Sequence, residues 1–77
     1  MIRIFAQHAH VGEYHLKTRY IEPGRWGWHA AAPNLRRLPE FSGEATTLEA
    51  AKKSACNSIG LAFADWMPIG PGIEFPD

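Results

Sequence analysis

The sequence contains only one cysteine, Cys56, and it has neither a long apolar run nor an excess of charge of either sign. One cysteine excludes a disulfide within the chain, and it is typical of proteins kept in a reducing compartment. A membrane-spanning helix needs about 18 consecutive apolar residues, which no stretch of this sequence approaches. The first residues also lack the apolar centre of an export signal. We therefore expect a cytoplasmic protein that makes no contact with a membrane.

The length and composition are those of one small globular domain. The chain has 77 residues, of which 45% are hydrophobic and 21% are charged, so global disorder is not expected. A chain of this length buries barely enough apolar surface to offset the conformational entropy lost on folding. Without a disulfide, association with a second chain is the remaining source of stability. The composition therefore favours a homodimer.

Charge is unevenly distributed along the chain, although eight basic and eight acidic residues cancel overall. Residues 1–37 carry six basic and two acidic side chains, whereas residues 38–77 carry two basic and six acidic side chains. Such an asymmetry indicates a basic binding face. The alternative is that both signs are spread over a solvated surface, as most charged side chains are.

Three segments in the first half of the chain alternate between apolar and polar residues, as strands with one buried face do. They are residues 2–7, 14–21 and 25–32. Pro23-Gly24 lies between the last two segments and favours a tight turn, so these strands are expected to pair as an antiparallel hairpin. The two prolines of the segment 33–40 predict a loop, and a short further strand is expected over residues 41–45.

The second half of the chain predicts one helix. Thr46 and Glu49 have the spacing of a capping box, in which Thr46 is the N-cap. Apolar residues then recur every three or four positions from Leu48 to Trp66. This stripe predicts a helix that ends just before Pro68, which cannot continue it.

The predicted fold class is α+β, with an antiparallel three- to four-stranded sheet packed on one C-terminal helix in a single domain of residues 1–67. Residues 68–77 are rich in proline and glycine and form a C-terminal tail, which is either frayed or a short terminal edge strand. The expected core consists of Tyr14, Leu16, Tyr20, Trp26, Trp28, Leu48, Ile59 and Phe63. The opposite face of the sheet is expected to present Arg3, His15, Lys17, Arg19, Arg25 and His29.

Several motifs follow one another in an order that is typical of a known family. They are Ile21-Glu22-Pro23-Gly24, Gly27-Trp28-His29-Ala30, Pro33-Asn34-Leu35 and Gly43-Glu44-Ala45-Thr46-Thr47-Leu48-Glu49-Ala50-Ala51. In this order, over residues 14–59, the chain resembles the N-terminal domain of HicB-type antitoxins. The resemblance implies a small module of three strands and a helix that pairs with itself, with a small toxin-like protein as a further candidate partner. No ribbon-helix-helix or helix-turn-helix segment follows, so DNA binding is not implied.

The expected function is that of a non-enzymatic protein-interaction module. The alternative is a nucleic-acid-binding domain that uses the basic outer face of the sheet, because sheets with basic and aromatic side chains bind single strands by stacking. A sequence pI near 6.9 argues against a dedicated nucleic-acid binder. In both cases the expected binding residues lie on the basic face and in the loop that follows it: Lys17, Arg19, Arg25, His29, Arg36 and Arg37.

No residue pattern indicates catalysis, a cofactor or a metal site. Cys56 lies beside the apolar stripe of the predicted helix, where a free cysteine is usually a small buried hydrophobe. His8 and His10 share a face of one strand, and His15 and His29 are expected side by side on the hairpin. A zinc site needs three or four converging ligands, and no thiolate or carboxylate completes one here. We therefore expect these histidines to be ordinary exposed residues of the sheet.

Overall fold

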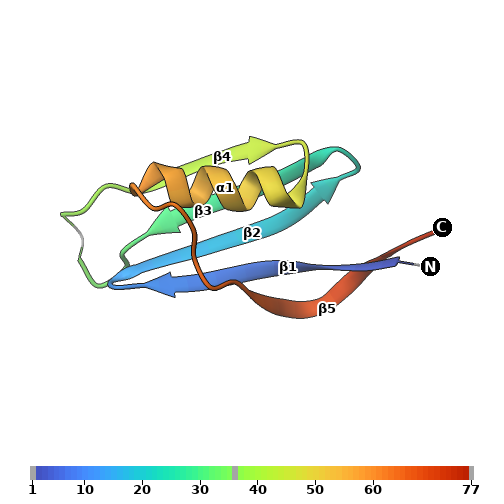
Figure 1. Ribbon diagram of the computed structural model, residues 1–77, viewed down its shortest axis with the longest axis horizontal. Coiled ribbons are helices and arrows are strands. Elements are labelled where there is room, and N and C mark those ends of the chain that lie inside the picture. Colours follow the sequence, from blue (N-terminus) through green and yellow to red (C-terminus); the bar gives the residue numbers. More distant parts are fainter. Residues whose placement is uncertain (1, 36, 77) are drawn as a thin grey trace.

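The structure, a computed structural model, describes residues 2–35 and 37–76 as a five-stranded antiparallel sheet with one helix on one face (Figure 1). The elements are β1 (Ile2–Val11), β2 (Tyr14–Glu22), β3 (Arg25–Ala31), β4 (Phe41–Ala45), α1 (Leu48–Ser58) and β5 (Met67–Phe75). The order across the sheet is β4-β3-β2-β1-β5. The predicted α+β class with an antiparallel sheet is confirmed. Two finer expectations are wrong, because the sheet has five strands rather than three or four, and α1 precedes β5 rather than ending the chain.

The hairpin of β1 and β2 makes β1 longer than predicted. β1 continues past its expected end to Val11, because a two-residue turn at Gly12 and Glu13 keeps the two strands in register. Gly12 has a φ of 60°, which suits a type II′ turn with glycine in its first central position. The turn places His10 directly opposite His15.

β2 and β3 form the predicted hairpin around Pro23-Gly24. Gly24 has a φ of 79°, as the third position of a type II turn requires when proline precedes it. The register shifts between Tyr20 and Glu22. The twist of a type II turn does not match the right-handed twist of two paired strands. The shift in register changes the local twist of β2 and so lets the two strands pair on both sides of the turn.

α1 begins one residue later than predicted, since Thr47 rather than Thr46 is the N-cap. Thr47 has an extended backbone, and its hydroxyl oxygen accepts a hydrogen bond of 3.1 Å from the Ala50 amide. A capping box needs a Glu or Gln at the third helical position. With Thr47 as the N-cap, this position is taken by Ala50, so the predicted capping box with Glu49 does not form. Glu49 instead complements the helix dipole from the first turn and forms an ion pair of 3.2 Å with Lys52.

α1 ends at Ser58, well before its predicted end. Gly60 adopts a left-handed φ of 75°, and the Gly60 and Leu61 amides donate to carbonyls of the last helical turn at 3.1 and 2.9 Å. These two bonds close a Schellman motif, which satisfies the last carbonyls and redirects the chain. The apolar periodicity continues past this point, but the chain is no longer helical. Phe63, which was expected in the core, is consequently 78% exposed.

The core between α1 and strands β2–β4 is built mainly from small side chains. Its buried apolar residues are Ala9, Leu16, Trp26, Ala30, Ala31, Ala32, Ala51, Ala55 and Cys56. Leu16 and Trp26 of the predicted core are buried, whereas Tyr14, Tyr20, Trp28, Leu48 and Ile59 are half-buried. Alanines let the helix approach the sheet closely, but each removes little apolar area from water. The chain alone therefore gains a modest amount of hydrophobic stabilisation.

Thr18 joins β1 to β2 at the point where their ladder ends. The ladder reaches only as far as His8 of β1. Next to it, the Gln7 amide donates to the Thr18 hydroxyl oxygen at 2.8 Å, and the hydroxyl donates to the Gln7 carbonyl at 3.0 Å. Thr18 is 3% exposed, so both bonds are shielded from water. Farther toward the chain ends, β1 diverges from β2 and pairs with β5 (Figure 1).

The first half of β1 and most of β5 form a two-stranded unit, here called the terminal ribbon (residues 2–6 and 69–75). Gly70-Pro71-Gly72 interrupts the regular register of β5 within it. Tyr20 of β2 contacts Phe75 of the ribbon edge to face, with ring centroids 5.4 Å apart. Most of the segment expected to be a tail is therefore a strand of the chain's own sheet.

Replacing Thr18 with Val should lower the free energy of unfolding by about 1–3 kcal/mol, because it removes the hydroxyl that bonds both the amide and the carbonyl of the half-buried Gln7. Thr18→Ser keeps the hydroxyl and should retain most of the stability. Urea denaturation of both variants measures the effect. Equal midpoints for Thr18→Val and the wild-type protein would show that this link is not needed.

Candidate functional site

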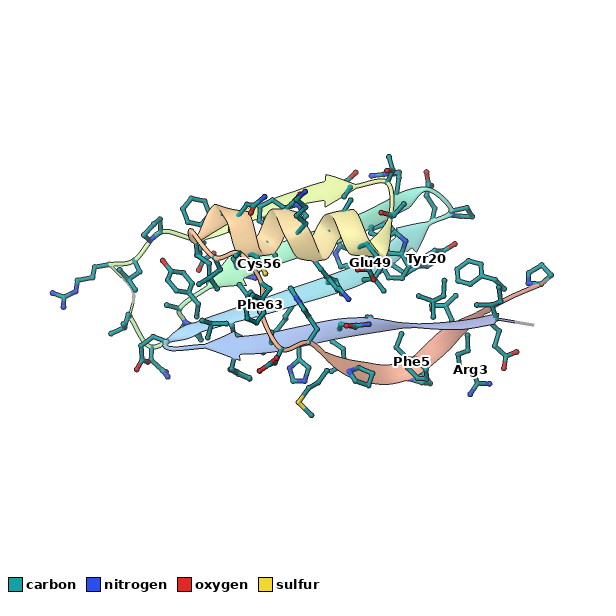
Figure 2. The ribbon with its side chains drawn as sticks, viewed as in Figure 1. Arg3, Phe5, Tyr20, Glu49, Cys56 and Phe63 are labelled. Carbon is teal, nitrogen blue, oxygen red and sulfur yellow. The ribbon has the colours of Figure 1, made fainter. Side chains whose placement is uncertain are left out.

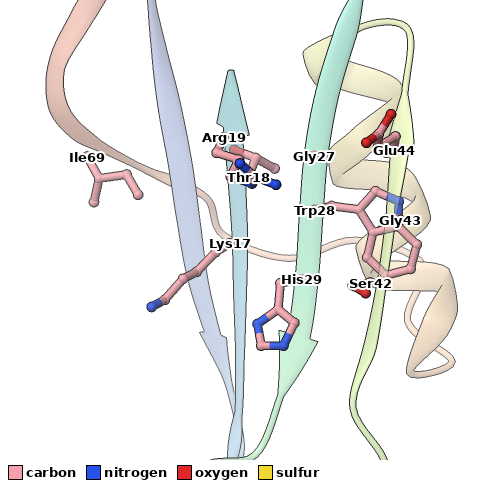
Figure 3. Close-up of a pocket in the computed structure, with 10 residues that line it drawn as sticks. All are labelled: Lys17, Thr18, Arg19, Gly27, Trp28, His29, Ser42, Gly43, Glu44 and Ile69. Carbon is pink, nitrogen blue, oxygen red and sulfur yellow. The ribbon is translucent and has the colours of Figure 1, made fainter. Parts of the chain in front are cut away.

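The face of the sheet that α1 leaves uncovered, here called the outer face, carries a broad groove. α1 packs against β2, β3 and β4 on the other face, and alternation directs every second side chain to the outer face. The groove has a volume of about 580 Å³ (Figure 3). We call it the outer groove. It is lined by residues that include Lys17 and Arg19 of β2, Trp28 and His29 of β3, Glu44 of β4 and Ile69 of β5.

Two glycines let side chains from neighbouring strands lie flat against the sheet, one on each face. A Cβ added to Gly27 would lie 3.1 Å from Nε of Arg19. A Cβ added to Gly43 would lie 3.0 Å from the Trp28 indole. A larger residue at either position would displace its neighbour, since packed atoms leave no such space. Arg19 therefore lies against the outer face at Gly27, whereas the Trp28 indole packs over Gly43 on the face that α1 covers and contacts the core.

Three of the predicted binding residues, Lys17, Arg19 and His29, lie together in the outer groove. Arg25 is engaged elsewhere, because its guanidinium donates to both carboxylate oxygens of Glu44 at 2.8–3.0 Å. The hydrogen bonds and the negative charge of Glu44 raise the pKa of Arg25. Arg25 is therefore neutralised within the chain and does not extend the basic surface.

The other predicted basic residues lie outside the outer groove. Arg37 is exposed in the loop between β3 and β4, and Arg36 lies outside the described residues. Arg3, which was expected on the same face, pairs with Glu74 on the terminal ribbon, on the far side from Tyr20 (Figure 2). The basic residues that the structure describes in the first half of the chain therefore do not gather on one surface.

A second hollow of about 400 Å³ lies between β2 and the terminal ribbon. It shares Arg19 and Ile69 with the outer groove, so the two adjoin. Its ribbon side is apolar: Ile69 and Ile73 line it and are 37% and 38% exposed. Ile2 of β1 is more exposed still, and so is Met67, which precedes the ribbon on β5 and pairs with His8. This end of the molecule therefore presents aliphatic side chains to the solvent.

Three histidines meet at the other end of β1. The rings of the register partners His10 and His15 stack, with centroids 4.1 Å apart. His8 places its Nδ1 atom 3.2 Å from Nε2 of His15. Burial lowers the pKa of His15, and the neighbouring positive charges of His10 and Lys17 lower it further. The expectation of ordinary exposed histidines did not include this histidine cluster.

The missed signal is the two-residue turn. The sequence predicted a turn over residues 8–13, which would take His8 and His10 out of the strand and leave His29 of β3 as the expected neighbour of His15. In the structure, the residue of β3 opposite His15 is Ala31. Gly-Glu between two alternating segments is itself a hairpin signal, and a turn centred on it pairs His10 with His15. The predicted first strand ended too early to bring these two residues together.

Cys56 is buried in α1, as the sequence predicts for a small hydrophobe. Burial raises the pKa of its thiol, and a hydrogen bond with Trp66 opposes this effect only in part. The thiol is therefore protonated at neutral pH, which is the unreactive form.

No protein-family model matches the chain, and no curated protein or solved structure is significantly similar to it. Within the described residues, no helix has the length and apolar character needed to cross a membrane. The functional inference therefore depends on three features of the outer face: the outer groove, the apolar ribbon beside it and the histidine cluster.

Cys56 should react slowly with a thiol reagent in the folded protein, because it is buried and its raised pKa leaves little thiolate. We expect a rate at pH 7.5 at least about tenfold below that of the urea-unfolded chain. The release of thionitrobenzoate from Ellman's reagent measures both rates. A fast reaction without denaturant would indicate an accessible thiolate.

Proposed function

We propose that this protein is a small non-enzymatic interaction module of the HicB antitoxin-domain type, which binds a second copy of itself through the terminal ribbon. The observation that carries the proposal is the exposed aliphatic surface of the ribbon around Ile69 and Ile73. Exposed apolar side chains that gather in one place are typical of protein-interaction sites.

The size of the accessible surface supports a second copy as the partner. The chain exposes 5244 Å², about 500 Å² more than the roughly 4,700 Å² expected for a compact monomer of 8.6 kDa. Its radius of gyration, 12.6 Å, also exceeds the roughly 11.5 Å expected for 77 residues. A stable dimer buries about 800 Å² per chain. Self-association would therefore supply the burial that the alanine-rich core does not.

The outer edge of β5 is a poor template for a further strand, which favours packing of faces over continuation of the sheet. Pro68 and Pro71 have no amide hydrogen to donate. Gly70 and Gly72 have positive φ angles of 75° and 81°, which interrupt the extended backbone. In a symmetric dimer, Ile73 and its neighbours would then pack against the same side chains of the second copy.

The order β2-β3-β4-α1 supports the HicB-type assignment, because the resemblance implies three strands followed by a helix. A small toxin-like protein is the further partner that the resemblance implies, and the outer groove is the surface we assign to it. The buried free thiol of Cys56 suits the reducing cytoplasm in which we place the protein.

The outer groove favours one second candidate function, the binding of single-stranded nucleic acid. Among the described residues Lys17 and Arg19 form no ion pair, and both line the outer groove. A positively charged groove that tracks the backbone is one part of such sites, but the Trp28 ring packs on the other face of the sheet and offers no stacking surface here. Glu44 in the same groove and the balanced overall charge make this candidate weaker than self-association.

A double variant, Lys17→Glu with Arg19→Glu, separates the two candidates. Nucleic-acid binding predicts that the wild-type protein holds a fluorescent oligonucleotide at low salt, that its affinity falls steeply as salt rises, and that the variant releases it. Our proposal predicts no oligonucleotide binding by either protein, and an unchanged oligomeric mass for the variant. Fluorescence anisotropy and sedimentation equilibrium measure the two properties.

Sedimentation equilibrium of the wild-type protein should give a mass of twice 8.6 kDa. Ile69→Asp should reduce the mass to that of one chain, because a carboxylate buried in an apolar interface costs several kcal/mol. Far-ultraviolet circular dichroism checks that the variant is folded.

Phe63→Asp is the matched control. Phe63 is also an exposed large apolar residue, but it lies in the segment after α1 rather than on the terminal ribbon. We expect this variant to remain a dimer. A wild-type mass of 8.6 kDa at micromolar concentration, or equal dissociation of both variants, would contradict association through the ribbon.

A further inference from the structure

Two neighbouring strands bring three imidazoles together on the outer face. His8 and His10 are two residues apart on β1 and project from the same face, and His15 faces His10 from β2. Their ring centroids are 4.1 to 5.7 Å apart. From this arrangement we propose that His8, His10 and His15 bind one divalent transition-metal ion of the zinc class.

The distances between the ring nitrogens are close to those that such an ion imposes. Two nitrogens bound at about 2.0–2.1 Å with a tetrahedral angle lie about 3.3 Å apart. His8 Nδ1 and His15 Nε2 are 3.2 Å apart, and one nitrogen from each of the three residues lies within 4.8 Å of the others. His10 is the ligand that must turn most, because its ring stacks on His15 at an interplanar angle of 14°. It is exposed, so rotation about χ2 meets little resistance.

The donor set defines the class of ion. Neutral imidazoles suit Zn²⁺, Ni²⁺ and Cu²⁺, whereas Mg²⁺ and Ca²⁺ require oxygen ligands, which the cluster does not offer. Three imidazoles leave a fourth coordination position for water or another ligand. The ion replaces the contact between His8 and His15. The imidazole that donated in this contact changes tautomer, so that its proton moves to the nitrogen that does not bind the metal. The binding of the ion to three neutral imidazoles therefore releases no net proton.

Lys17 limits the affinity of this site. It is the register partner of His8, and its positive charge beside the cluster opposes a cation. Burial of His15 acts in the other direction, since it favours the neutral imidazole that ligates a metal. The balance predicts a site that binds Zn²⁺ below millimolar concentration but more weakly than sites with thiolate ligands.

The metal site does not depend on the proposed function. His10 and His15 lie where β1 pairs with β2, and although His8 also pairs with Met67 of β5, the cluster lies outside residues 2–6 and 69–75 of the terminal ribbon. A failure of self-association would therefore leave the proposal intact, and a failure of metal binding would leave self-association intact.

Isothermal titration of the metal-free full chain with Zn²⁺ tests the proposal. We expect one ion per chain, and Co²⁺ at the same site should give the intense visible absorption of a four-coordinate ion. His10→Asn should weaken Zn²⁺ binding by about 100-fold, since loss of a direct ligand costs at least as much as loss of a residue that only supports one. His15→Asn should do the same.

His29→Asn is the matched control, because His29 also lies on the outer face but outside the cluster. It should leave the affinity unchanged. Three results would overturn the proposal: no heat of binding at millimolar Zn²⁺, equal weakening by His29→Asn and His10→Asn, or one ion per two chains. Circular dichroism of each variant separates loss of the site from loss of the fold.

Discussion

The arrangement of this molecule depends on the two hydrogen bonds between Thr18 and the backbone of Gln7. β1 belongs to two structures at once, because residues 8–11 pair with β2 and residues 2–8 pair with β5. At the point of divergence the ladder bonds end, and the Thr18 hydroxyl satisfies both polar groups of Gln7. This threonine thereby fixes the position of the terminal ribbon relative to the histidine cluster.

The small core has a direct consequence for the surface. α1 covers β2, β3 and β4 through alanines and Leu16, and β1 and β5 extend beyond it. Ala9 of β1 still belongs to the core, but no residue of β5 is buried. Ile69 and Ile73 of β5 remain exposed, and the outer groove stays open because it lies on the face opposite α1.

Local turn chemistry could be predicted from the sequence, whereas distant pairing could not. Pro23-Gly24 specifies the β2–β3 hairpin because both of its φ preferences are properties of the residues themselves. The end of α1 was predicted wrongly because the apolar periodicity continues past Gly60, while the Schellman motif there depends on one glycine in a left-handed conformation. The pairing of β1 with β5 joins opposite ends of the chain, and no local pattern specifies it.

The same distinction applies to the sites. Lys17, Arg19 and His29 meet in the outer groove because they alternate on a hairpin whose turn was predictable. The partner of Arg25 was not predictable, since Glu44 reaches it only once β4 has paired with β3. Pairing between strands also decides which histidine faces His15.

The pairing of Ile2 with Phe75 brings the two ends of the chain together. Register partners in an antiparallel pair lie only about 5 Å apart at their Cα atoms, so the N- and C-terminal ends of the sheet emerge side by side (Figure 1). A short peptide could join them while new ends are opened in the loop between β3 and β4, and every strand would keep its neighbours. Any domain fused to either end would stand beside the ribbon, so an appended domain would have immediate access to whatever the ribbon binds.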